Sequence, residues 1–256
     1  MSLAAKITQA QNLITQSKHA IVLTGAGIST PSGIPDFRSP GSGLWEKADP
    51  YQVASIIGFK RRPQDFYDWI HPLAKLTMAA RPNPAHLALA QLETVGSIKG
   101  IITQNIDMLH TKAGSETVYE IHGHMRQMTC MRCYQIFDSA PFLEIFLETQ
   151  AVPLCTSCQG VLKPNVILFG EQLPIRVVEQ AEKQVRLCDL MIVAGSSLEV
   201  APVCDLPMKA LANGARLIVV NFEETYADRY ADVVIHADVV DILPQFTKPF
   251  NEYRGS

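Results

Sequence analysis

Four cysteines in this sequence are spaced as metal ligands. They form two Cys-x2-Cys pairs, and two tight turns of this kind present four thiolates to one tetrahedral ion: Cys130, Cys133, Cys155 and Cys158. Four protein ligands leave no open position for water, so the sequence predicts a structural zinc ion in a zinc-ribbon module. Two disulfides or a redox pair are the alternatives, and the N-terminal residues, which do not resemble a secretory signal, argue against both.

A glycine-rich stretch, GAGISTPSGIPDFR at residues 25–38, begins like a dinucleotide-binding loop and then departs from the pattern. Gly25 and Gly27 stand where a tight turn and a close approach to a pyrophosphate require glycine, but Thr30 replaces the third glycine. Asp36 comes too early to end a second strand and bind a ribose. The ordinary dinucleotide fingerprint therefore does not describe what this loop holds.

Composition and charge exclude several classes of protein. The 256 residues are 47% hydrophobic, enough for a sizeable core in one large domain with a small module. A net charge of -3 and an isoelectric point near 6.2 provide no general attraction to nucleic acid or to an anionic membrane. No stretch approaches the roughly 20 apolar residues that cross a bilayer. We expect a monomeric, cytoplasmic protein.

Apolar runs of strand length alternate with helical patterns along the chain. Nearly unbroken apolar strands of this kind belong to parallel sheets that helices cover on both faces. The sequence therefore predicts an α/β fold with a doubly wound, Rossmann-like parallel sheet. Its expected strands are 20–24, 100–103, 118–121, 190–194, 217–220 and 233–235, and clear helical patterns occupy 85–94, 175–187 and 203–213.

The cysteine pairs interrupt this alternation, which predicts a small lobe inserted into the sheet domain. We assign the Rossmann-like domain to residues 1–48, 83–124 and 165–256. Residues 125–164 are expected to form the zinc-ribbon module. Residues 49–82, rich in aromatic and basic side chains, are expected to form a helical part of the same lobe.

Polar motifs follow five of the expected strands. In chain order they are GAG, TQNIDMLH, EIHGH, AGSSLEVAP and VVNFEE. The carboxyl ends of parallel strands meet at one edge of a sheet, and ligands of open α/β sheets bind there. These motifs are therefore expected to form one site.

Taken together, the motifs resemble those of the sirtuin family, the NAD-dependent protein lysine deacylases. In order they are GAGIS, GIPDFRS, TQNID, HG, the four cysteines, KPNVILFGE, GSSL and VN, and the resemblance extends from about residue 6 to residue 247. Each motif alone is a weak signal, but their shared order is specific. The resemblance implies a transferase that consumes NAD and yields nicotinamide, O-acyl-ADP-ribose and the deacylated lysine.

The resemblance also implies which residues bind NAD. Gly25, Ala26 and Gly27 would lie at a helix N-terminus and point N–H groups at the pyrophosphate. The QNID segment would form the nicotinamide pocket, where a carboxylate beside a backbone N–H satisfies an amide; an Asn-x-Asp helix cap is the alternative. The remaining matching positions are Ser29, Thr30, Phe37, Arg38, Gln104, Asn105, Ile106, Asp107, His122, Gly195, Ser196, Ser197, Asn221 and Asp238.

The catalytic pair implied by the resemblance is His122 with Asn105. His122 ends an expected strand and precedes Gly123, as in the family's catalytic motif. In that chemistry the acyl oxygen attacks ribose C1′ as nicotinamide leaves, and the histidine removes a proton from a ribose hydroxyl. An imidazole with a pKa near 6.5 suits this transfer at neutral pH. His124 is the competing candidate outside the motif.

Two extended segments, VILFGE and SLEVAP, resemble the family's clamp for an acyl-lysine peptide. A peptide that adds as a strand is held mainly by main-chain hydrogen bonds, a mode that tolerates many sequences. An ordinary buried strand is the alternative for residues 166–169. The implied substrate contacts are Ile167, Phe169, Gly170, Glu171 and Val200.

The stretch QDFYDWIHPL, residues 64–73, bears on which acyl group is removed. In the desuccinylase branch of the family, a tyrosine and an arginine three residues later bind the acyl carboxylate. Here Tyr67 matches, but Ile70 replaces the arginine. We therefore expect these two residues to line a site for acetyl or longer neutral acyl groups, with succinyl-lysine a poor substrate, because an unpaired buried carboxylate is costly. Simple helix packing is the alternative for Ile70.

Two other functions remain open from the sequence. A mono-ADP-ribosyltransferase would use the same NAD site and release nicotinamide without removing an acyl group. A non-catalytic NAD sensor or zinc-ribbon binding module is the second. His122, Asn105 and Asp107 argue against the second, because a binding module needs no base at the ribose.

Overall fold

A six-stranded parallel sheet forms the centre of the computed structural model, which describes residues 1–36 and 49–251. The strand order is β3-β2-β1-β7-β8-β9, so the direction of winding reverses between β1 and β7. Open parallel sheets bind ligands at such a switch point. The strands are Ala20–Thr24 (β1), Ile98–Thr103 (β2), Val118–Glu120 (β3), Leu190–Ala194 (β7), Arg216–Val220 (β8) and Val233–Ile235 (β9).

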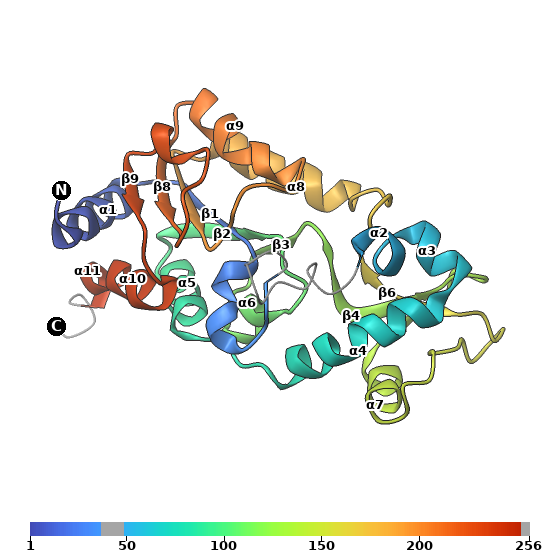
Figure 1. Ribbon diagram of the computed structural model, residues 1–256. Coiled ribbons are helices and arrows are strands. Elements are labelled where there is room, and N and C mark those ends of the chain that lie inside the picture. The colour runs from blue at the N-terminus through green and yellow to red at the C-terminus, as the bar shows by residue number, and fades with distance from the viewer. Residues whose placement is uncertain (37–48, 252–256) are drawn as a thin grey trace.

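Helices cover both faces of this sheet, which confirms the predicted doubly wound architecture. Ala20 and Val22 of β1 pack in a core with α1 (Leu3–Gln16), α5 (Pro84–Thr94) and α10 (Val239–Phe246). Ile21 and Leu23 point the other way, into a core with α8 (Ile175–Leu187) and α9 (Leu206–Ala212). Figure 1 shows α8 and α9 along one side of the sheet and α5 and α10 along the other.

Several helices begin at a side-chain cap. Ser2 accepts a hydrogen bond from the backbone N–H of Ala5 at the start of α1, and Asn83 caps α5 with a proline at its first position.

Among the residues that the structure describes, no helix has the length and apolar character needed to cross a membrane. Shorter helical segments are η4 (Val203–Asp205), η5 (Asp228–Tyr230), α6 (Leu109–Lys112) and α11 (Lys248–Asn251).

A second, antiparallel sheet with the order β5-β4-β6 builds the small lobe around its own apolar core. Gly123 pairs with Val166, so this sheet extends slightly beyond the predicted module of residues 125–164. Its strands are Gly123–Cys130 (β4), Ile136–Asp138 (β5) and Leu162–Val166 (β6), and its helices are Pro50–Val53 (α2), Ile56–Arg61 (α3), Pro63–Ala79 (α4) and Ala140–Thr149 (α7). In Figure 1 these elements lie together at the end of the molecule away from α1 and α10.

The first loop lies directly against the end of β7. The backbone N–H of Gly27 donates to the carbonyl oxygen of Gly195 at 2.9 Å. A Cβ atom on Gly195 would lie 2.3 Å from the backbone nitrogen of Ile28, and its φ of +60° is left-handed. Two single turns of 3-10 helix follow, η1 (Ala26–Ile28) and η2 (Thr30–Ser32), where the sequence predicted the N-terminus of a helix.

Gly195→Ala is expected to destabilise the protein far more than Gly214→Ala. Both glycines have left-handed φ angles, but a Cβ on Gly214 would have no neighbour within 4 Å. Left-handed strain alone costs about 1–2 kcal/mol, and overpacking at Gly195 adds about 1–3 kcal/mol. Urea denaturation of the two variants measures the difference in the free energy of unfolding. Equal losses would contradict a tight contact between the loop and β7.

Candidate active site

The four predicted metal ligands come together between β4 and β6. Their sulfur atoms all lie within 4.8 Å of one another. Cys130 Sγ is 3.5 Å from Cys158 Sγ, and Cys133 Sγ is 3.7 Å from Cys155 Sγ. A tetrahedron with Zn–S bonds of about 2.3 Å has edges of about 3.8 Å, so the cluster fits zinc. These distances are far too long for disulfide bonds, which are about 2.05 Å.

The backbone around the cysteines also suits a metal-bound thiolate. The N–H groups of Arg132 and Cys133 each lie 3.4 Å from Cys130 Sγ and donate toward it. A Cβ atom on Gly160 would lie 2.9 Å from the same sulfur, so the turn before β6 needs glycine there. Backbone donors that fix a ligand sulfur are a usual part of such sites.

The loop after β2 and the first loop meet in a buried polar cluster. Ser29 Oγ donates to Asp107 Oδ2 at 2.6 Å, and Asn105 Nδ2 donates to Ser29 Oγ at 3.1 Å and to the carbonyl oxygen of Gly25 at 3.0 Å. Asp107 Oδ1 also accepts from the N–H of Leu109, the first residue of α6. Burial raises the pKa of the Asp107 carboxyl, and the hydrogen bonds from Ser29 and Leu109 oppose that rise.

His122 is held in one tautomer beside this cluster. Its Nδ1 lies 3.0 Å from the carbonyl oxygen of Gln104. A carbonyl only accepts, so Nδ1 carries the proton and Nε2 keeps its lone pair. Burial lowers the pKa of His122, and the bond to Gln104 opposes this change. The ring is therefore a neutral base at neutral pH.

His124, the competing candidate, lies on β4 in a different setting. It is half-buried, and burial together with the Arg126 guanidinium lowers its pKa. Arg126 itself donates to both carboxylate oxygens of Glu120, the first of them at 2.7 Å. His124 Nδ1 is buried and has no hydrogen-bond partner among the described residues, whereas His122 Nδ1 is bonded to Gln104.

The predicted contacts of the first loop are only partly available to a ligand. The N–H groups of Gly25 and Gly27 are bonded to Ala194 and Gly195, so these glycines act mainly through close packing. Thr30 Oγ1 donates back to the carbonyl oxygen of Gly27 at 3.1 Å. The predicted contacts at residues 37 and 38 lie outside the described residues.

The other predicted cofactor contacts line the ends of β7, β8 and β9. Ser196 is buried and accepts from the N–H of Leu198 at 3.3 Å, whereas Ser197 is exposed. Asn221 Nδ2 donates to the carbonyl oxygen of Glu223 at 2.9 Å. Asp238 caps α10 by accepting from the N–H of Val240 at 3.0 Å, which accounts for its position without a ligand.

The predicted substrate segment, residues 167–171, connects the two lobes. Ile167 donates its N–H to the carbonyl oxygen of His122 at 2.8 Å. Phe169 exchanges backbone hydrogen bonds with Ala54 and Ile56 of the helical part, at 2.9 and 3.0 Å. The centre of its ring lies 5.3 Å from the centre of the Tyr51 ring, and the side chain remains partly exposed. Gly170 follows with a left-handed φ of +83°.

Glu171, a predicted substrate contact, braces this segment. Its Oε2 accepts from the N–H of Leu168 at 2.8 Å and lies 2.9 Å from Lys163 Nζ. Lys163, only 6% exposed, also donates to the carbonyl oxygens of Pro164 and Val166. Burial lowers the pKa of Lys163, and the pairing with Glu171 opposes that change.

Tyr67 and Ile70 lie in the core of the small lobe. They are 1% and 3% exposed and pack in one cluster with Phe59, Phe66 and Phe146. The Tyr67 hydroxyl donates to the carbonyl oxygen of Leu162 at 2.6 Å. In this structure the hydroxyl is therefore already bonded, and helix packing, the alternative for Ile70, describes its surroundings.

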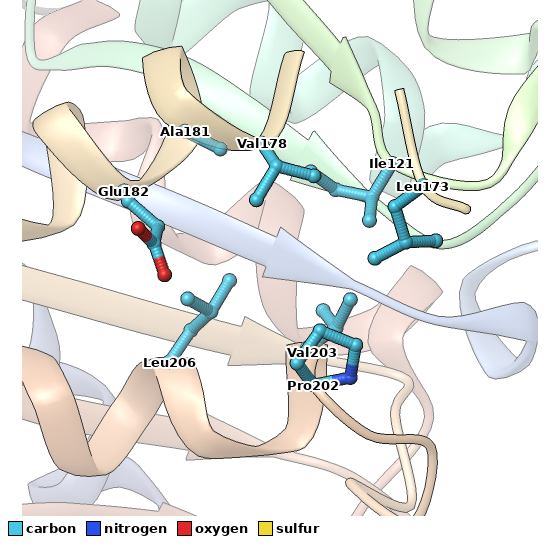
Figure 2. Close-up of a pocket in the computed structure, with 8 residues that line it drawn as sticks. All are labelled: Ile121, Leu173, Val178, Ala181, Glu182, Pro202, Val203 and Leu206. Carbon is cyan, nitrogen blue, oxygen red and sulfur yellow. The ribbon is translucent and has the colours of Figure 1, made fainter. Parts of the chain in front are cut away.

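A separate small pocket lies against the α8 face of the sheet. Figure 2 shows apolar side chains from both sides facing one another, among them Val178, Pro202 and Leu206, with the Glu182 carboxylate at one end. Its cavity volume is about 20 Å³, which is near the space that one water molecule requires. The pocket is therefore far too small for a dinucleotide.

Sequence reasoning missed several buried residues that support the site. Thr24 and Thr103 end neighbouring strands in register, and their hydroxyl groups are hydrogen-bonded at 2.9 Å. His110 Nε2 lies 2.9 Å from Thr24 Oγ1. Lys163 donates to the carbonyl oxygen of Val166 and pairs with Glu171, and so supports residues 166–171. A threonine at the end of both strands was a visible signal, but only the strand order makes the two residues partners.

Fold and site together define a dinucleotide-binding α/β protein with a four-cysteine metal lobe. The profile of the Sir2 family matches residues 25–202. The chain belongs to the Sir2 family.

Relatives across nearly the whole chain agree with this assignment. NAD-dependent protein deacylase 2 of Archaeoglobus fulgidus is 45% identical over 251 residues, which is 98% of each chain. NAD-dependent protein deacetylase 2 of Caldanaerobacter subterraneus is 47% identical over 227 residues, or 89% of each chain. A Sir2 structure with p53 peptide and NAD+ has a TM-score of 0.87 at 37% identity and covers 96% of this chain and 99% of its own.

One zinc ion per chain is expected, and Cys155→Ser should lose it. Metal binding to four thiolates is also folding free energy for the small lobe, so this variant should unfold at a lower temperature. Elemental analysis and calorimetry measure the two effects. Cys204→Ser, outside the cluster, is the control and should keep zinc. Folded wild-type protein without zinc would refute the assignment.

Lys163→Met should cost much more stability than Lys209→Met. Both lysines pair with a glutamate, but the pair of Lys209 and Glu182 is largely exposed, whereas Lys163 is buried. Removing one partner of a buried pair costs about 3–5 kcal/mol, and an exposed pair contributes about 0–1 kcal/mol. Chemical denaturation measures both. A loss below about 1 kcal/mol for Lys163→Met would show that the brace is unimportant.

Proposed function

We propose that this protein is an NAD-dependent protein lysine deacylase that releases nicotinamide and transfers the acyl group to ADP-ribose. Its membership of the Sir2 family supports this activity. The observation that carries the proposal is His122, a neutral histidine with a lone pair on Nε2, beside the buried cluster of Ser29, Asn105 and Asp107. A protein that only binds NAD has no use for a base held in this way.

The residues at the carboxyl edge of the sheet are suited to hold NAD. When bound, NAD supplies a ribose carbon whose bond to nicotinamide breaks and which accepts the acyl oxygen. Asn105 and Asp107 would orient the nicotinamide end, and Asn221 would bind the adenosine ribose. The side-chain nitrogen of Gln104 is buried and has no hydrogen-bond partner among the described residues, as expected for a group aimed at a ligand.

His122 would perform the proton transfer. Its Nε2 accepts a proton from a ribose hydroxyl, while Gln104 holds the protonated Nδ1 and stabilises the imidazolium that forms. The N–H of Ile167 donates to the carbonyl oxygen of His122 and so fixes the backbone of His122. Ring and backbone are therefore both oriented before the reaction starts, which is how a protein increases the effective concentration of a base.

The acyl-lysine peptide would bind between residues 167–169 and 197–200. Residues 167–169 are fixed in place by the backbone pairing of Phe169 with the helical part of the small lobe and by the ion pair of Lys163 and Glu171. A peptide that adds as a strand here would place its lysine toward His122. In this proposal the Rossmann-like domain binds NAD, the small lobe completes the peptide site, and the protein works as a cytoplasmic monomer.

His122→Ala is expected to fold, to keep zinc and to lose about 10²- to 10⁴-fold in NAD-dependent deacetylation, the usual contribution of one general base. An acetyl-lysine peptide incubated with and without NAD, read by mass, measures this loss. Because burial lowers the pKa of His122, the acidic decline of wild-type kcat should lie below pH 6.5.

The same mass assay tests the reaction class. Deacetylation by His122→Ala within a few-fold of wild type would overturn the role of the base. Nicotinamide release by wild type without any shortening of the acyl-lysine would identify an ADP-ribosyltransferase instead.

Wild-type protein should deacetylate a peptide much faster than it desuccinylates the same sequence. Tyr67 and Ile70 present no cation, and the Tyr67 hydroxyl is already bonded to Leu162. Ile70→Arg should lower the free energy of unfolding, because it buries an unpaired charge, and should not create desuccinylase activity. Phe66→Leu controls for a change in packing alone. Equal wild-type rates on both acyl groups, or a desuccinylating Ile70→Arg, would contradict this expectation.

A further inference from the structure

Buried polar side chains form a nearly closed ring behind the first cofactor loop. They come from the ends of β1 and β2, the loop after β2, the start of α5 and α6, and each is at most 9% exposed. The proposed reaction uses only the part of this ring that faces the cofactor. The remaining part contains two histidines, His86 and His110, that are 0% and 2% exposed.

One half of the ring starts at the N-terminus of α5. Asn83 Nδ2 donates to the carbonyl oxygen of Ile28 at 2.8 Å and to Ser32 Oγ at 3.0 Å. The backbone N–H of Asn83 donates to His86 Nδ1 at 3.4 Å and completes a capping box. Asn83 therefore connects the first loop to His86.

The other half starts at the loop after β2. The N–H of Asn105 donates to Thr103 Oγ1 at 3.1 Å, and Thr24 Oγ1 donates to the same oxygen at 2.9 Å. His110 Nε2 lies 2.9 Å from Thr24 Oγ1. Since the single hydroxyl proton of Thr24 is directed at Thr103, His110 must be the donor in this contact.

The two halves meet at the two imidazole rings. Their centres are 4.9 Å apart and their planes are inclined by 59°. His86 Nε2 and His110 Nδ1 are both buried, and neither has a partner among the residues described. Buried polar atoms in folded proteins are normally paired.

The hydrogen bonds already made determine which nitrogen carries each proton. A neutral imidazole has one N–H and one lone pair. His86 accepts at Nδ1, so its proton is on Nε2. His110 donates from Nε2, so its lone pair is on Nδ1. The two unpartnered atoms are therefore a donor and an acceptor.

Both rings remain neutral at neutral pH. Burial lowers the pKa of His86 to about 4. Burial, with a further contribution from His86, lowers the pKa of His110 well below its ordinary value. A second proton on either ring would place two donors against each other, so the neutral forms are the ones that can pair.

We propose that His86 Nε2–H donates a hydrogen bond to His110 Nδ1, which makes both histidines positioning residues for NAD; the inference rests on the cofactor site of the proposed function. Ser29 already joins the first loop to Asn105 and Asp107 on the cofactor side. The histidine pair would join the same two loops through Asn83 on one side and through Thr24 and Thr103 on the other. Loops fixed on both sides need less ordering when NAD binds.

Nitrogen NMR of protein labelled with ¹⁵N-histidine tests the bond without any activity measurement. At pH 7 both residues should be the Nε2–H tautomer, with an exchange-protected His86 Nε2 proton and scalar coupling from His86 Nε2 to His110 Nδ1. A His110 ring protonated on Nδ1, or both expected tautomers without this coupling, would overturn the proposal.

Calorimetric titration with NAD in the absence of peptide tests the positioning role. His86→Phe keeps a ring but loses the donor, so its Kd for NAD should rise about tenfold, equivalent to about 1.4 kcal/mol, with peptide KM unchanged. His86→Gln retains a donor and should recover part of this loss. Leu89→Val, a core change on the same helix, is the control and should stay within twofold of wild type.

The outcomes separate this inference from the proposed function. His86→Phe that binds NAD as well as Leu89→Val does would remove the positioning role. If His86→Phe does not fold, the comparison of His86→Gln with Leu89→Val decides, and equal NAD affinities there overturn the role. Wild-type protein that binds no NAD would instead refute the proposed function, while the NMR result would still decide whether the histidine bond exists.

Discussion

The close contact between the backbones of Gly27 and Gly195 determines how the proposed NAD site is built at the carboxyl edge of the parallel sheet, called the cofactor edge below. It leaves no room for a side chain and brings the first loop directly onto the end of β7. Once the loop is there, Ser29 reaches Asp107, and Asn105 reaches both Ser29 and Gly25. The polar cluster is thus a consequence of packing between glycines at the switch point of the sheet.

The small lobe is tied to the same edge through its strands. β4 leaves the cofactor edge directly after His122 and ends at the first zinc ligand, Cys130. β6 returns from the second cysteine pair and leads into residues 167–171. A metal ion held by the four cysteines would therefore fix both strands, β4 and β6, at their ends next to the cluster.

The parts of the molecule that sequence reasoning described correctly are those set by local patterns. The apolar runs placed all six strands of the parallel sheet, and the cysteine spacing identified a cluster that fits zinc. The convergence of Ser29, Asn105 and Asp107 followed from the rule that strand ends meet.

The parts that could not be predicted depend on partners far away in sequence. Glu171 supports its own segment because Lys163 is buried beneath it. Tyr67 is held by the carbonyl oxygen of Leu162, a partner that no motif on α4 reveals. His86 and His110 read as ordinary residues of a helix and a loop until the fold brings their rings to 4.9 Å.

Two hydrogen bonds hold His122 at the point where the two lobes meet. Its ring is bonded to Gln104 of the large domain, while its carbonyl oxygen is bonded to Ile167, and Gly123 follows with a left-handed φ of +77°. In any rotation of one rigid body against another, displacement grows with distance from the pivot. A rotation of the small lobe about this point would move α7 and the four-cysteine cluster far, while His122 stayed nearly in place. Such a rotation would change the separation of the two lobes without breaking the contacts that orient the proposed base.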